Sequence, residues 1–207
     1  MRYLFVVLFV LAVLVLPRPL LAAQPVILVL GDSLSAGYGI DRQRGWVQLL
    51  QNRLRQSGYA YQVVNASVSG DTTDSGLSRL PYALKQHQPG IIIIELGGND
   101  GLRGLALSQL QTNLNQLVSI SKQAGAKVIL CRERIPPNLG PVYSTKFSEQ
   151  FEAVATKQKV PLVPYLLKGV ADDPALMQAD GIHPNEKGQP GMLENVWPVL
   201  LPLLIKK

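Results

Sequence analysis

A run of four consecutive isoleucines, at residues 91–94, constrains the fold of this chain more than any other feature. Isoleucine is β-branched and favours strands, and a strand that is apolar on both faces must be covered on both faces. The parallel sheets of α/β proteins meet this requirement, because their crossover helices pack on both sides of the sheet. The isoleucine run is therefore predicted to form a central strand of a parallel sheet.

The rest of the chain alternates short apolar runs with longer amphipathic segments, a pattern typical of βαβ units. Strands are predicted over residues 26–30, 61–65, 91–94, 127–131 and 160–163. Helices are predicted over 46–54, 77–88, 107–124 and 144–157, and a last helix near Pro184 is interrupted by later prolines. The pattern predicts one three-layer α/β domain with a parallel sheet of about five strands and ligand chemistry at the strand carboxyl ends.

The first residues have the pattern of a secretory signal peptide. Arg2 is followed by an uncharged apolar stretch over residues 3–16 and then by a segment that ends in Ala22 and Ala23. This stretch is shorter than the ~20 residues of a membrane span, and Arg18 interrupts it. We expect residues 1–23 to be removed and residues 24–207 to form an exported domain, periplasmic or secreted. An uncleaved anchor is the alternative, because neither alanine gives a clean A-x-A site.

Composition excludes several classes of function. The chain has 207 residues, of which 47% are hydrophobic and 16% charged, so it is able to bury a sizeable core. One cysteine excludes a disulfide framework, and two histidines disfavour zinc catalysis, so no metal and no cofactor are expected. The net charge of +6 comes from scattered Lys and Arg, and no nucleic-acid partner is expected. Cys131 ends an apolar run and is predicted to be buried.

Four polar loops occupy the positions where this topology places chemistry. Residues 31–34, 65–71 and 97–100 follow the first three strands, and residues 180–184 precede the last helix. They contain a hydroxyl nucleophile in Ser33, an imidazole in His183 and a carboxylate in Asp180. A serine hydrolase needs these three groups together with donors for the developing oxyanion, and Gly70 and Asn99 are candidates for the donors.

Each of these residues also has a purely structural interpretation. Ser33 suits a helix N-cap, and Gly70 and Asn99 suit turns. His183 differs from His87, which lies on a polar helix end, because Ile182 and Pro184 flank it and Asp180 precedes it by three residues. The combination in four loops favours catalysis over four unrelated turns.

The four loops resemble the sequence blocks of the GDSL/SGNH hydrolase family, in order and in spacing. Ser33 lies in Gly-Asp-Ser-Leu, Gly70 in Ser-Gly-Asp-Thr, Asn99 in Gly-Gly-Asn-Asp, and His183 follows Asp180 in the last block. The longer strings around these blocks are similar to the periplasmic thioesterase I, lysophospholipase and arylesterase branch of the family.

This resemblance implies a flavodoxin-like hydrolase that cleaves acyl esters and thioesters, lysophospholipids included. Ser33 is expected to attack the acyl carbonyl, His183 to act as base and then acid, and Asp180 to orient His183. The expected oxyanion hole consists of the Ser33 N–H, the Gly70 N–H and the Asn99 side chain. Asp32 and Asp100 are expected to support the loops rather than to react.

Apolar residues beside these loops are expected to contact the acyl chain, although they equally suit simple coverage of the sheet. They are Leu77, Leu80, Leu102, Leu105, Ile135 and Pro136. We expect a monomer with at most transient membrane contact. A carbohydrate acetyl esterase of the same superfamily and a noncatalytic acyl-binding protein are the alternative functions.

The chain also departs from this branch of the family. Glu133 belongs to a charged segment where the branch usually carries an apolar residue, Ala179 stands where a second aspartate is common, and Gly188 interrupts the start of the last helix. We interpret these departures as changes to the pocket edge and to stability, not to the reaction.

Overall fold

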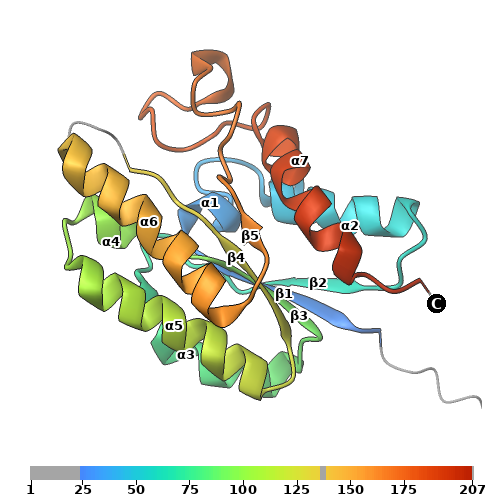
Figure 1. Cartoon of the computed structure of the whole chain (residues 1–207). Coiled ribbons are helices and arrows are strands. Elements are labelled where there is room, and N and C mark those ends of the chain that lie inside the picture. The colour runs from blue at the N-terminus through green and yellow to red at the C-terminus, as the bar shows by residue number, and fades with distance from the viewer. Residues whose placement is uncertain (1–23, 136–138, 207) are drawn as a thin grey trace, which may run out of the picture.

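The computed structural model describes residues 24–135 and 139–206, and its core is a five-stranded parallel sheet with the strand order β2-β1-β3-β4-β5 (Figure 1). The predicted signal peptide and Pro136 lie outside the described residues. The strands are β1 Val26–Gly31, β2 Gln62–Asn65, β3 Ile91–Glu95, β4 Lys127–Cys131 and β5 Leu162–Val163. The isoleucine run forms the fully buried central strand, which confirms the predicted parallel sheet.

Helices cover both faces of the sheet, as expected for three layers (Figure 1). One face is covered by α2 (Trp46–Gln56) and α7 (Gln189–Leu200), and the other by α3 (Thr73–His87), α5 (Leu107–Gln123) and α6 (Pro141–Gln158). Side chains alternate between the two faces, so Ile92 and Ile94 lie in one core cluster and Ile91 and Ile93 in the other. Cys131 is buried at the end of β4, as predicted.

Short helical segments connect these layers. Two of them, α1 (Ser33–Ala36) and α4 (Gly98–Leu102), lie at the carboxyl edge of the sheet, within the predicted functional loops. The described residues also include the 3-10 turns η1 (Arg42–Arg44), η3 (Pro174–Leu176) and η4 (Leu201–Leu203). Among the residues described, no helix combines the length and apolar character that crossing a membrane requires.

The last helix begins later than predicted. We expected it near Pro184, but α7 starts at Gln189, with Pro190 in its first turn, where a missing N–H costs no helical hydrogen bond. The Asn185 side chain donates instead to two carbonyl groups, Ala175 O at 2.9 Å and Met177 O at 3.0 Å. These bonds hold residues 184–188 as a turn, so the predicted helix start was wrong.

A second boundary differs for a local reason. Helix α3 begins at Thr73, four residues before the predicted start, because the Thr72 hydroxyl caps it by accepting from Ser75 N at 3.3 Å. The apolar periodicity used for the prediction begins only after this polar first turn.

The close packing of α4 against α6 gives a test of the core. A Cβ at Gly101 would lie 2.5 Å from Ile135 Cγ2 and 2.7 Å from Phe147 Cε2, and both side chains are buried. Gly101→Ala is therefore expected to lower the free energy of unfolding by about 1–3 kcal/mol through overpacking. Urea denaturation measures the change.

Gly90→Ala is the matched control, because the nearest atom to its Cβ would be Val26 O at 4.0 Å. Equal stability of the two variants would contradict the packing argument.

Candidate active site

Ser33 occupies the first turn of α1, directly after β1. Asp32 caps this helix by accepting from Leu34 N at 3.1 Å. The strand ends at Gly31, where a Cβ would lie 2.6 Å from Glu95 Oε2 and 2.8 Å from Ser35 Cβ, so glycine leaves room for these two side chains. The turn thus presents the Ser33 hydroxyl at the carboxyl edge of the sheet.

The Ser33 hydroxyl meets His183 across 150 residues of sequence. The distance from His183 Nε2 to Ser33 Oγ is 2.9 Å, and the distance from His183 Nδ1 to Asp180 Oδ2 is 2.7 Å. The structure therefore brings the three predicted catalytic residues into one hydrogen-bonded row. That order of hydroxyl, imidazole and carboxylate is the geometry that activates a serine.

The Asp180 carboxylate is held by the loop that carries His183. Its Oδ1 atom accepts from His183 N at 3.0 Å and from Ile182 N at 2.9 Å. The backbone bond from His183, the ring bond and the Ile182 bond lower the pKa of Asp180 to about 2. An ionised Asp180 only accepts hydrogen bonds, so it favours the tautomer with hydrogen on Nδ1 and leaves Nε2 to accept from Ser33.

Two residues that the sequence did not single out hold the imidazole in place. The Tyr38 ring lies over the His183 ring, with centroids 4.6 Å apart and planes tilted by 41°. Gln178 donates from Nε2 to Tyr38 O at 2.8 Å and to Pro184 O at 3.0 Å. Tyr38 follows the first sequence block, and its nearness to His183 results from the fold alone.

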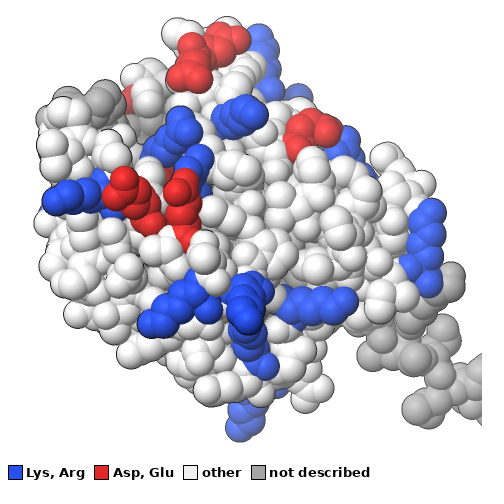
Figure 2. Space-filling model, viewed as in Figure 1, with Lys and Arg blue, Asp and Glu red and all other residues white. Residues whose placement is uncertain are grey.

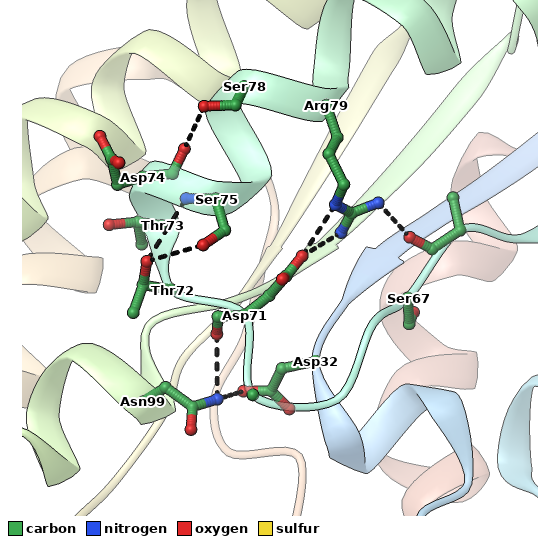
Figure 3. Close-up of polar contacts among 12 residues, drawn as sticks. Asp32, Ser67, Asp71, Thr72, Thr73, Asp74, Ser75, Ser78, Arg79 and Asn99 are labelled. Atoms are coloured by element: carbon green, nitrogen blue, oxygen red, sulfur yellow. Dashed lines mark hydrogen bonds and ion pairs between the residues drawn. The ribbon is translucent and has the colours of Figure 1, made fainter.

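Asn99 lies beside the residue that precedes Ser33 (Figure 3). Its Nδ2 donates to Asp32 Oδ2 at 3.0 Å and to Asp71 O at 2.9 Å, which fixes the orientation of the amide. Gly70, the other predicted oxyanion donor, has a φ of 85°, and its carbonyl accepts from Arg103 Nη2 at 2.9 Å. The positive φ explains why glycine occupies this position.

An ion pair anchors the loop that contains Gly70 (Figure 3). The Arg79 guanidinium, on α3, pairs with the Asp71 carboxylate and donates from Nη1 to Ala66 O at 2.7 Å. In the next loop, Asp100 accepts from Thr73 N at 2.9 Å. Asp100 therefore supports a loop, in agreement with the interpretation made from the sequence.

Three carboxyl groups are buried beneath the catalytic row, and burial raises the pKa of each. The pKa of Asp32 rises to about 6. Glu95 and Glu133 have pKa values well above the usual range, because burial disfavours the charged form and neighbouring carboxyl groups add to the effect. Glu95 Oε2 accepts from Ser35 Oγ at 2.5 Å and from Asp32 N at 3.3 Å.

A cavity of about 430 Å³ opens onto the catalytic row. Ser33, His183 and Asn99 line it together with apolar residues and five further polar residues. The apolar residues are Leu34, Leu102, Ile135, Leu167, Ala171, Met177 and Ile182, and the further polar residues are Asp32, Glu133, Arg134, Tyr165 and Asp172.

Only part of the predicted acyl-contact set lies at this cavity. Leu102 and Ile135 line it. Leu80 is fully buried in the core, and Leu77 packs against the same core cluster, so both cover the sheet. Leu105 is 41% exposed and is not among the described cavity residues. The segment that supplies Tyr165, Leu167 and Met177 was not predicted, because it has no regular periodicity.

Comparison with known proteins gives the class to which this fold and site belong. Residues 29–189 match the model of the GDSL-like lipase/acylhydrolase family, and the chain belongs to that family. The predicted GDSL/SGNH membership is therefore confirmed, and the chain is an ester or thioester hydrolase of this family.

Particular relatives are similar over most of their length. The esterase TesA of Pseudomonas aeruginosa is 54% identical over 183 residues, covering 88% of this chain and 91% of the relative. The thioesterase 1/protease 1/lysophospholipase L1 of Escherichia coli is 43% identical over 88% of this chain and 86% of the relative. The crystal structure of TesA superposes with a TM-score of 0.85 over 86% of this chain and 99% of that chain.

Asn99 provides a test of the predicted oxyanion donors. Removal of one such donor typically lowers kcat by ~10²–10³-fold. Asn99→Ala is expected to show that loss on a p-nitrophenyl ester while the protein stays folded, because the ion pair between Asp71 and Arg79 still holds the loop. A kcat like that of the wild type would contradict the assignment.

Glu95 provides a test of the buried carboxyl groups. Its pKa is 4.5 in the unfolded chain and well above this in the folded protein, because burial disfavours the charged form and the neighbouring carboxyl groups of Asp32 and Glu133 add to the effect. The Cys131 thiol also lies nearby. Above pH 4.5 the unfolded form loses the proton that the folded form keeps, so Glu95 makes stability fall as pH rises. The melting temperature of Glu95→Gln should therefore rise relative to wild type between pH 4 and pH 8.

Glu149→Gln is the control for this measurement, because Glu149 is exposed on α6. A melting-temperature difference between Glu95→Gln and wild type that stays constant with pH would show that Glu95 is ionised in the folded protein.

Proposed function

We propose that this protein is a serine hydrolase that cleaves carboxylic esters and thioesters of acyl chains through an acyl-enzyme on Ser33. The observation that carries the proposal is the row from Ser33 Oγ to His183 Nε2 and from His183 Nδ1 to Asp180, at 2.9 and 2.7 Å, beside an apolar cavity. The esterase, thioesterase and lysophospholipase names of the relatives support the same class of substrate.

The reaction follows from the hydrogen bonds of the row. Ser33 Oγ attacks the acyl carbonyl carbon while its proton moves to His183 Nε2, and Asp180 stabilises the imidazolium. The imidazolium then gives this proton to the leaving alcohol or thiol. A water molecule attacks the acyl-enzyme with His183 again as the base, and the carboxylic acid and the Ser33 hydroxyl are released.

The oxyanion of each tetrahedral intermediate needs donors that are already oriented. We assign this role to Ser33 N–H, Gly70 N–H and Asn99 Nδ2. Asn99 keeps one N–H on Asp71 O, and its second N–H turns from Asp32 Oδ2 to the oxyanion. The two existing bonds, at 2.9 and 3.0 Å, hold the amide next to the α1 turn before substrate arrives.

The cavity supports a broad acyl preference. Its apolar walls discriminate each added methylene by ~1–3 kcal/mol at most, so chains of several lengths are accepted. These walls favour acyl chains over sugars, and the sugar esterase alternative gains no support from them. Export to the periplasm, carried by the signal pattern of residues 1–23, belongs to the same proposal. So does a monomeric state.

The test is hydrolysis of p-nitrophenyl esters of increasing acyl length by the wild type and by Ser33→Ala. The variant lacks the nucleophile, so turnover is expected to fall by at least ~10³-fold with an unchanged melting temperature. Ser57→Ala, at the end of α2 and distant in sequence from the four loops, is the control and should keep full activity. Turnover by Ser33→Ala at the wild-type rate would assign the nucleophile elsewhere.

A further inference from the structure

Glu133 is a buried carboxyl group that the proposed mechanism does not use. It follows β4, lines the catalytic cavity and is only 3% exposed. Its Oε1 atom is buried and has no hydrogen-bond partner among the described residues. The main chain at this position is fixed, because Ser148 Oγ donates to Glu133 O at 3.1 Å. A buried polar atom without a partner is costly, so its retention at the wall of a binding cavity points to a ligand.

The surroundings of Glu133 keep it neutral. Burial raises its pKa well above 4.5, and the charge of Asp32 raises it further. The strand register places Glu95 and Cys131 side by side at the ends of β3 and β4. Arg134, Tyr165 and Asp172 line the same cavity as Glu133. Arg134 is the cation next to Glu133, but its guanidinium lies over the Tyr165 ring, and no ion pair joins it to Glu133 among the described residues. A neutral carboxyl group has one O–H donor and one carbonyl acceptor.

The cavity next to Glu133 is mostly apolar. The Glu133 carboxyl group therefore determines which functional group on a substrate chain can bind there. An unsubstituted alkyl chain fits the walls but leaves the Glu133 carboxyl without a partner. A hydroxyl group on the chain both accepts and donates, so it satisfies both halves of a neutral carboxyl group. Charged groups of both signs line the same cavity, since the Arg134 guanidinium, 4.7 Å from the Tyr165 ring centroid, is accompanied there by the Asp172 carboxyl group.

We propose that Glu133 recognises a hydroxyl group on the acyl chain and makes this hydrolase selective for hydroxyacyl esters and thioesters. The inference rests on the proposed function and deepens it by naming a substrate class for the same site. Glu133 is a specificity residue here, since it contacts the chain and not the reacting carbonyl.

The experiment compares kcat/KM for ethyl octanoate with kcat/KM for its 3-, 6-, 7- and 8-hydroxy derivatives. Scanning the hydroxyl along the chain finds the carbon that lies opposite Glu133. The wild type is expected to prefer one hydroxylated ester by about tenfold, the ratio that one hydrogen bond supplies. Glu133→Leu should lose this preference while it hydrolyses ethyl octanoate at least as well as the wild type.

Two further variants separate recognition from a structural effect. Glu133→Gln keeps a neutral donor and acceptor of similar size, so it should retain most of the preference at the same carbon. Glu133→Met is a second apolar replacement that tests the inference if a branched leucine does not fold. The exposed Glu149→Gln change is the control and should leave all the ratios unchanged.

The inference is overturned if the wild type shows no preference at any hydroxyl position, or if Glu133→Leu and Glu133→Met keep the preference. A stronger preference of the wild type for ethyl 8-aminooctanoate that Glu133→Leu abolishes would also overturn it, because that result requires an ionised Glu133. Failure of the proposed function would differ from these results, since the wild type would then not hydrolyse plain ethyl octanoate.

Discussion

The parallel pairing of β1 with β3 is the contact on which the site depends. Five residue pairs, from Ile27 with Ile91 to Gly31 with Glu95, set the register of the two strands. Because the strands end together, the turn with Ser33 and the turn with Asn99 leave the sheet side by side. A slip of one residue in either strand would separate these turns and move Gly31 away from Glu95.

The carboxyl groups of the site have pKa values shifted in opposite directions. Asp180 lies near the surface, accepts two backbone N–H groups and stays ionised, so it orients the imidazole and stabilises it when protonated. Asp32, Glu95 and Glu133 are buried, and burial raises their pKa values. The Asp180 carboxylate thus faces the base, while buried carboxyl groups with raised pKa values support the turns and the cavity wall. The surface contrasts with this interior, since Figure 2 shows Lys and Arg spread over the face that includes α6 and α7, with Asp and Glu among them.

The site could be predicted from the sequence to the extent that its residues lie in short local patterns. Ser33, Asn99 and His183 stand in loops whose composition differs from that of the strands around them, and the structure brings these residues together. The cavity walls were harder to predict. Leucine at helical spacing looks the same whether it faces a sheet or a cavity, so Leu80 and Leu102 were grouped although only Leu102 lines the cavity. Tyr165 and Met177 come from an irregular segment, whose apolar residues show no regular periodicity.

The sequence by itself determined the central strand, the alternation of strands and helices, and the four polar loops, because these depend on neighbours within a few residues. Tertiary structure alone decided which side chains meet across 150 residues, as Ser33 and His183 do. It also decided that α7 begins at Gln189, because the bonds of Asn185 to a distant turn outweigh local helix signals. The raised pKa of Glu133 also depends on the tertiary structure, since burial within the fold disfavours the charged form of the carboxyl group.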